Sequence, residues 1–117
     1  MEGVVVEPGG GERLTAKTRV ATIKLGRDEL ALVEFELEPG FRGPPVHAHD
    51  DQLDSFYVLE GEVEFVVEDD RMLLGPGSFV AAPPGVRHTF AGGPGRSRLL
   101  NLHAPSAGFH EWLRQVS

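Results

Sequence analysis

Three histidines and one aspartate carry most of the chemistry that this sequence could perform. His47 and His49 are separated by one residue, Asp54 follows in the same segment, and His88 lies in a second segment. Side chains of an extended strand point to the same face at every second residue, so His47 and His49 share a face if this segment is extended. Three imidazoles and one carboxylate that meet on one interior face would form a metal site.

The elements that would position these residues are short strands. Fifteen glycines and nine prolines divide the chain into brief segments, which is typical of an all-β protein. Residues 31–37 alternate between apolar and polar faces, and residues 13–25 are expected to form one alternating strand. About eight to ten strands of this kind predict a barrel or a sandwich. The inward-facing side chains are expected to be Phe56, Val58, Val63, Phe65, Val80, Phe90 and Leu100.

Only the C-terminal tail breaks the strand pattern. After Pro105, apolar residues recur at helical spacing, which predicts one short helix. Phe109 and Trp112 are expected to anchor this helix to the barrel, and His110 is expected to lie on the surface.

Composition limits the remaining possibilities. The 117 residues are within the usual size of one domain, so residues 1–117 are expected to form one. The net charge of -7 argues against nonspecific binding to nucleic acid or to an anionic membrane. The chain has no cysteine, so any metal must be held by nitrogen and oxygen. With no signal peptide and no apolar run of the roughly 20 residues that span a bilayer, a soluble cytoplasmic protein is expected.

Two spaced motifs surround the candidate ligands. The first, residues 40–61, has Gly40, six residues, His47-Ala48-His49, four residues, Asp54, six residues and Gly61. The second, residues 77–92, has Gly77, five residues, Pro83-Pro84-Gly85, two residues, His88, three residues and Gly92. Fifteen residues separate the two motifs.

These motifs resemble those of the cupin superfamily, in its small single-domain form. The resemblance implies a jelly-roll β-barrel, usually dimeric, with one divalent transition metal near its mouth. His47, His49 and His88 occupy the three histidine positions of the motifs. The C-terminal tail is similar to that of small cupins resembling quercetin dioxygenases.

The chain departs from the cupin pattern at three points. Asp54 stands where the family has glutamate, Gly92 stands where it has asparagine, and the first gap is one residue longer. The shorter carboxylate of Asp54 could bind the metal directly, act through a water, or accept a hydrogen bond from a ligand histidine. Asp50, Asp51 and Gln52 could compete for the fourth ligand position or form a solvated rim.

The resemblance implies a dioxygenase-like enzyme acting on a small aromatic or enolic substrate, with Fe, Mn, Ni or Cu. A metal-dependent isomerase or lyase of a sugar-like substrate is an alternative, and so is a non-catalytic binding module with a structural metal, such as Zn, or none. Phe56, Phe90 and His103 are candidates for the substrate pocket, although a histidine placed like His103 is more often structural than catalytic. Arg42 and Arg87 could pair with an anionic substrate. A homodimer is expected, with Tyr57, Leu59 and Leu73 outside the barrel.

Overall fold

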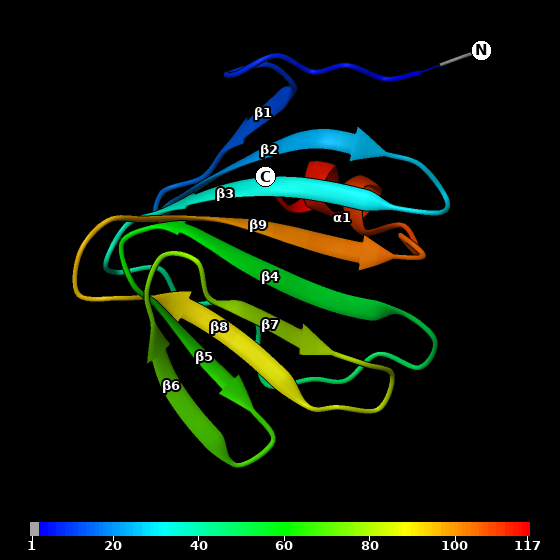
Figure 1. Ribbon diagram of the computed structural model, residues 1–117. Helices are drawn as coiled ribbons and strands as arrows, with labels where there is room; N and C mark the ends of the chain where they lie inside the picture. Colours follow the sequence, from blue (N-terminus) through cyan, green and yellow to red (C-terminus); the bar gives the residue numbers. More distant parts are fainter. Residues whose placement is uncertain (1–2) are drawn as a thin grey trace.

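The computed structural model describes residues 3–117, which form nine strands and one short C-terminal helix (Figure 1). The elements are β1 (Glu12–Thr15), β2 (Arg19–Gly26), β3 (Ala31–Leu37), β4 (Leu53–Glu60), β5 (Val63–Val67), β6 (Asp70–Leu74), β7 (Phe79–Ala82), β8 (His88–Gly92), β9 (Ser97–Ala104) and α1 (Phe109–Val116). The predicted all-β barrel with a terminal helix is therefore confirmed.

The strands form two antiparallel sheets that face each other. The larger sheet has the order β1-β2-β3-β9-β4-β7, and the smaller has the order β6-β5-β8. Strands distant in the sequence are neighbours, since β9 lies between β3 and β4, as expected for a jelly roll. Helix α1 lies beside β2 and β3 (Figure 1).

Alternation along the strands places the core between the sheets. In β3 every second residue is buried, from Ala31 to Leu37, as the sequence pattern predicts. The expectation that residues 13–25 form one strand is wrong, because β1 and β2 are two strands of a hairpin. The turn between them is closed by a hydrogen bond from Ala16 N to Arg19 O at 2.9 Å. The sequence does carry a sign of this turn, because the three consecutive polar residues Lys17, Thr18 and Arg19 interrupt the alternation there.

On β9 the inward face is the opposite of the one expected. Leu99 is fully buried, whereas Leu100 is only half-buried, so Leu99 replaces Leu100 in the core. The same inward face carries Asn101 and His103. This register brings polar side chains from β9 into the barrel interior.

The C-terminal helix docks differently from the prediction. His110, expected on the surface, is buried, and a Cβ atom at Gly26 would lie 2.7 Å from its ring. Trp112, expected to anchor the helix, is 48% exposed. Leu113 packs into the core instead, and Phe109 lies partly buried against it. The helix therefore turns its His110 and Leu113 side towards the barrel.

Two motif glycines are required by close backbone contacts. Gly61 has a φ of 68°, and a Cβ atom there would lie 2.2 Å from Arg96 O. At Gly92, which replaces the asparagine of the family pattern, a Cβ atom would lie 2.4 Å from Glu38 O. This close approach explains why a larger residue does not occupy position 92 in this chain.

Candidate metal centre

Three separate segments bring the four candidate ligands together. His47 and His49 precede β4, Asp54 is the second residue of β4, and His88 begins β8. Backbone hydrogen bonds join the two histidine segments, from His47 N to His88 O at 3.1 Å and from His88 N to His47 O at 2.8 Å. The proline-rich stretch before His47 forms no regular strand, as expected from its composition.

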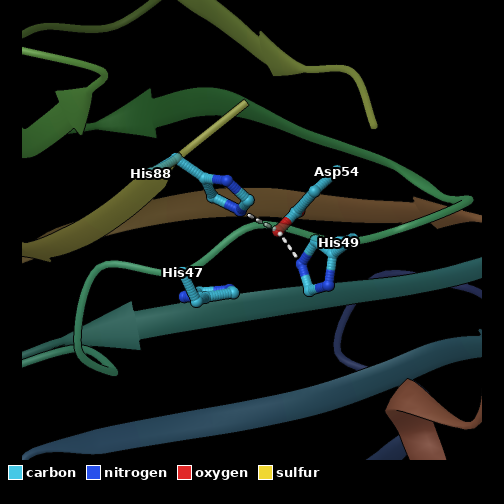
Figure 2. A group of neighbouring side chains, drawn as sticks. All are labelled: His47, His49, Asp54 and His88. Atoms are coloured by element: carbon cyan, nitrogen blue, oxygen red, sulfur yellow. Dashed lines mark hydrogen bonds and ion pairs between the residues drawn. The ribbon is translucent and has the colours of Figure 1, made fainter. Parts of the chain in front are cut away.

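The four side chains converge on one point, as Figure 2 shows. One ligand atom from each of His47, His49, Asp54 and His88 lies within 4.8 Å of the others. The Oδ2 atom of Asp54 is 2.7 Å from Nε2 of His88 and 3.2 Å from Nε2 of His49. The side chain of Asp54 is therefore long enough to reach the space shared by the imidazoles.

Hydrogen bonds to the backbone fix the rings of two histidines. Nδ1 of His47 is 2.9 Å from Pro45 O, and Nδ1 of His88 is 2.9 Å from Val86 O. A carbonyl can only accept, so Nδ1 carries a proton in both rings and Nε2 is the atom that would face a cation. Histidine ligands in metal sites are commonly oriented in this way. Nε2 of His88 donates to Asp54 in this structure and would lose that proton on binding a cation. The donor set and its orientation fit one divalent transition metal.

The second oxygen of Asp54 is held by Asn101. Nδ2 of Asn101 donates to Asp54 Oδ1 at 2.7 Å and to Ser55 O at 2.9 Å. Burial would raise the pKa of Asp54, but hydrogen bonds from His88 and Asn101 and the nearby His103 outweigh it, and the pKa is lowered. Asp54 is thus held as a carboxylate although it is almost fully buried.

The imidazoles of His88 and His49 differ in the direction of their pKa shifts. Burial tends to lower the pKa of His88, but its hydrogen bonds with Asp54 and Val86 O prevail, and its pKa is raised. Burial lowers the pKa of His49 despite the nearby carboxylate. The carboxylate of Asp54 is therefore shared unequally, with the shorter contact made by His88.

His103 lies beside the four-residue cluster. Its Nε2 is 3.2 Å from Asn101 Oδ1 and 3.2 Å from Asp54 Oδ1, and its Nδ1 is 2.5 Å from Gln52 Oε1. The ring stacks on Phe109 with centroids 3.7 Å apart. Burial lowers the pKa of His103 to about 4, so the imidazole is neutral near pH 7.

The cluster opens onto a cavity of about 800 Å³, within the range of small-molecule sites. Phe56, Phe90 and His103 all line this cavity. So does Arg42, whereas Arg87 is exposed and is not part of the lining. Helix α1 covers part of the cavity through Phe109, Trp112 and Leu113. The walls are mainly apolar and include five phenylalanines and Trp112, which suits an apolar or aromatic ligand.

Three polar residues at or beside the cavity were not predicted as site residues. The sequence motifs do not indicate Asn101 or Arg19, and they indicate Gln52 only as a rival ligand or a rim residue. Asn101 and Arg19 share a sequence signal, which is a polar residue at an inward position of an alternating strand. Asp50 and Asp51, the other rivals to Asp54, are exposed and lie outside the cluster.

Among residues 3–117, no helix has the length and apolarity needed to cross a membrane.

Comparison with known proteins gives the class of this chain. The cupin domain family Cupin_2 matches residues 33–103, more than half of the sequence. This chain belongs to the cupin family.

Individual relatives agree with that assignment. The chain is 32% identical over 100 residues to quercetin 2,3-dioxygenase of Bacillus subtilis, a match that covers 83% of this chain and 30% of that enzyme. An RmlC-like cupin from Shewanella frigidimarina is 22% identical with a TM-score of 0.78, covering 94% of this chain and 96% of that one. KdgF from Halomonas sp. is 18% identical with a TM-score of 0.76, covering 90% and 94% of the two chains. The two solved structures support the fold, and this chain spans under a third of the dioxygenase.

Proposed function

We propose that this cupin binds one divalent transition metal and acts as a dioxygenase-like enzyme on a small aromatic or enolic substrate. The observation that carries the proposal is the convergence of three imidazoles and one carboxylate at an aromatic-lined cavity. Similarity to quercetin 2,3-dioxygenase of Bacillus subtilis supports this reaction class.

In this proposal His47, His49 and His88 hold the metal through Nε2, and Asp54 completes the set through Oδ2. A bound Fe, Mn, Ni or Cu ion would supply Lewis-acid and redox chemistry beside the cavity. Phe56 and Phe90 orient the substrate ring by aromatic contact, and Phe109 and Trp112 limit access of water from the side of α1. Asn101 keeps Asp54 in place by holding its Oδ1 atom.

Elemental analysis of the purified protein tests the metal part of the proposal. We expect close to one transition metal per chain in the wild type and a loss of more than about 100-fold in metal affinity in Asp54→Ala, since even changes to partners of a ligand cost about 10–100-fold. Asp51→Ala is the matched control, because Asp51 is an exposed aspartate just before the same strand. Equal metal content in the wild type and Asp54→Ala would show that Asp54 is not a ligand.

Oxygen uptake with quercetin, measured on protein loaded with Fe, Mn, Ni or Cu in turn, tests the reaction class. The zinc form is the control, because Zn²⁺ has no redox chemistry. Metal-dependent consumption of oxygen is expected. Turnover of sugar-like or uronate substrates without oxygen uptake would instead support the isomerase or lyase alternative.

A non-catalytic binding module is the second candidate. The observation that favours it is that both oxygens of Asp54 already have hydrogen-bond partners within the protein. Tight binding of a small molecule, with no turnover by any metal form, would support this candidate over the enzyme.

We also propose a homodimer that forms through the outer face of the larger sheet. Tyr57 and Phe79 are cross-strand partners on this face, and they are 40% and 62% exposed. Light scattering is expected to give a dimer, and Phe79→Lys is expected to shift it towards monomer.

A further inference from the structure

Arg19 is an arginine on the inward face of the barrel. It begins β2 and shares that face with Ala21 and Ile23, both buried. It is only 9% exposed, and it lines the same cavity as the histidine cluster. A buried guanidinium is costly unless its charge is compensated.

The neighbours of Arg19 compensate its charge only in part. Its Nη1 donates to Leu14 O at 3.1 Å and its Nη2 donates to Ser117 Oγ at 2.6 Å. Both acceptors are neutral. Among the residues that the structure describes, no carboxylate lies within ion-pair distance of Arg19. Burial lowers the pKa of Arg19 from its ordinary value, as expected for a cation without an anionic partner.

Arg19 differs from most other arginines of the chain because it has no carboxylate partner among the described residues. Six of the nine pair with glutamates, and most of these six are well exposed. Arg98, the least exposed of the six at 36% of its side chain, is held by both Glu34 and Glu60. In the described part of the chain three arginines have no carboxylate partner, and two of them, Arg19 and Arg42, line the cavity. Two of the three arginines without a carboxylate partner among the described residues therefore lie at the cavity.

The position of Arg19 sets the shape of a ligand that would reach it. Pairing of β2 with β3 and of β3 with β9 places Arg19 level with Ser97, six residues along β9 from His103. At about 3.3 Å per residue, the backbone of Arg19 and the histidine cluster are separated by about 20 Å measured along the strand direction. Phe35, Phe41 and Phe90 line the cavity together with both groups. A ligand touching both ends would be elongated and largely apolar.

We propose that Arg19 binds the anionic group of an organic acid whose apolar body occupies the aromatic cavity, with its other end towards the histidine cluster. This inference deepens the proposed function, because it names the substrate class of the same cavity. A guanidinium with N–H groups to spare binds a carboxylate well, since its planar fork matches the two oxygens.

The single tryptophan of the sequence gives a direct measurement. Trp112 lines the cavity, so a ligand that enters it is expected to change the fluorescence of this residue. The probes are cinnamate and its neutral amide, with octanoate and octanamide as a second pair that has an aliphatic body. Each acid and amide pair differs in charge and little in shape.

We expect cinnamate or octanoate to bind better than its amide, and Arg19→Gln to weaken binding of the acid by about 10- to 100-fold. The amide affinities should not change. Arg87→Gln is the matched control, because Arg87 also lacks a carboxylate partner among residues 3–117 but does not line the cavity. Equal affinity of wild type and Arg19→Gln for the acids would overturn the proposal, as would failure of both acids to bind in the millimolar range.

Thermal unfolding is recorded for each variant, because Arg19 also joins the end of α1 to β1. If Arg19→Gln does not fold, Arg19→Lys replaces it, since lysine keeps the charge but loses the fork. Its loss of acid affinity should exceed that of Arg87→Lys, and equal affinities would again overturn the proposal. Titration of metal-free Asp54→Ala with the two acids distinguishes the two proposals. Acid binding that depends on Arg19 but not on metal would support this inference even if the metal-dependent function failed. If the wild type and the Arg19 variant consume oxygen at the same rate and neither acid binds, this inference is overturned while the proposed function stands.

Discussion

Along β4 and along β9, the inward-facing side chains are apolar at one end of the strand and polar at the other. At one end they contribute Val58 and Leu99, which are almost fully buried among apolar side chains. At the other end they contribute Asp54 and His103, equally buried but polar. The backbone register is continuous between the two ends, with Val58 opposite Leu99 and Asp54 opposite His103.

The apolar end contributes mainly to the stability of the barrel, and the polar end contributes to the candidate metal site. The apolar end stabilises the barrel by removing hydrocarbon from water, and it requires only suitable size and shape. The polar end must give each buried hydrogen-bonding group a partner, and its contacts run from Gln52 through His103 and Asn101 to Asp54. Substitutions at the two ends should therefore fail in different ways.

The largest effect on stability is expected in the apolar core that contains Val58 and Leu99, to which Phe65 of β5 also belongs. Phe65 is 1% exposed, and its ring packs against Phe56 with centroids 5.3 Å apart. Phe65→Ala should lower the free energy of unfolding by about 3–5 kcal/mol, because it removes buried surface and leaves a cavity. Urea denaturation measures this loss. Metal content per folded chain should be unchanged, and loss of metal from protein that remains folded would show that the two ends are coupled.

At the polar end, Asn101→Ala is expected to affect metal binding. It removes the donor that holds Asp54 Oδ1 and leaves this buried oxygen without its shortest hydrogen bond. Loss of such a partner costs about 10–100-fold in metal affinity, which metal-chelator competition would measure. Ser97→Ala is a matched control, because Ser97 is a buried polar residue on the same face of β9 but its hydroxyl has no partner among the described residues. Similar metal affinities in both variants would contradict a positioning role for Asn101.

The smallest effect concerns pH. In the metal-free protein the pKa of His103 is about 4, against an ordinary value of 6.5 in the unfolded chain. Between these values the unfolded chain binds more protons, so the free energy of unfolding falls as the pH falls. His103 should account for about 1 kcal/mol of that loss between pH 6.5 and 5.5.

Urea denaturation of the wild type and His103→Gln in the presence of a chelator would test this contribution. The variant should lose less stability over the same pH interval, whatever its stability at neutral pH. Parallel pH profiles would show that His103 is not the group responsible.

The sequence alone determined the strand-rich architecture and the identity of the clustered side chains. Alternation in residues 31–37 and the spacing of the two motifs are local features, and strand geometry converts them directly into faces and turns. His47, His49, Asp54 and His88 were identified in this way, and the structure brings all four together. Their role as metal ligands remains a proposal.

The tertiary structure alone decided which polar residues support that cluster. Nothing local indicates that Asn101 meets Asp54, because the contact depends on β9 pairing with β4 rather than with a neighbour in sequence. The burial of His110 and the place of Arg19 in the cavity likewise depend on how α1 docks against the barrel. A pattern in one strand specifies a face, but the partner across that face is specified only when distant strands and the helix pack together.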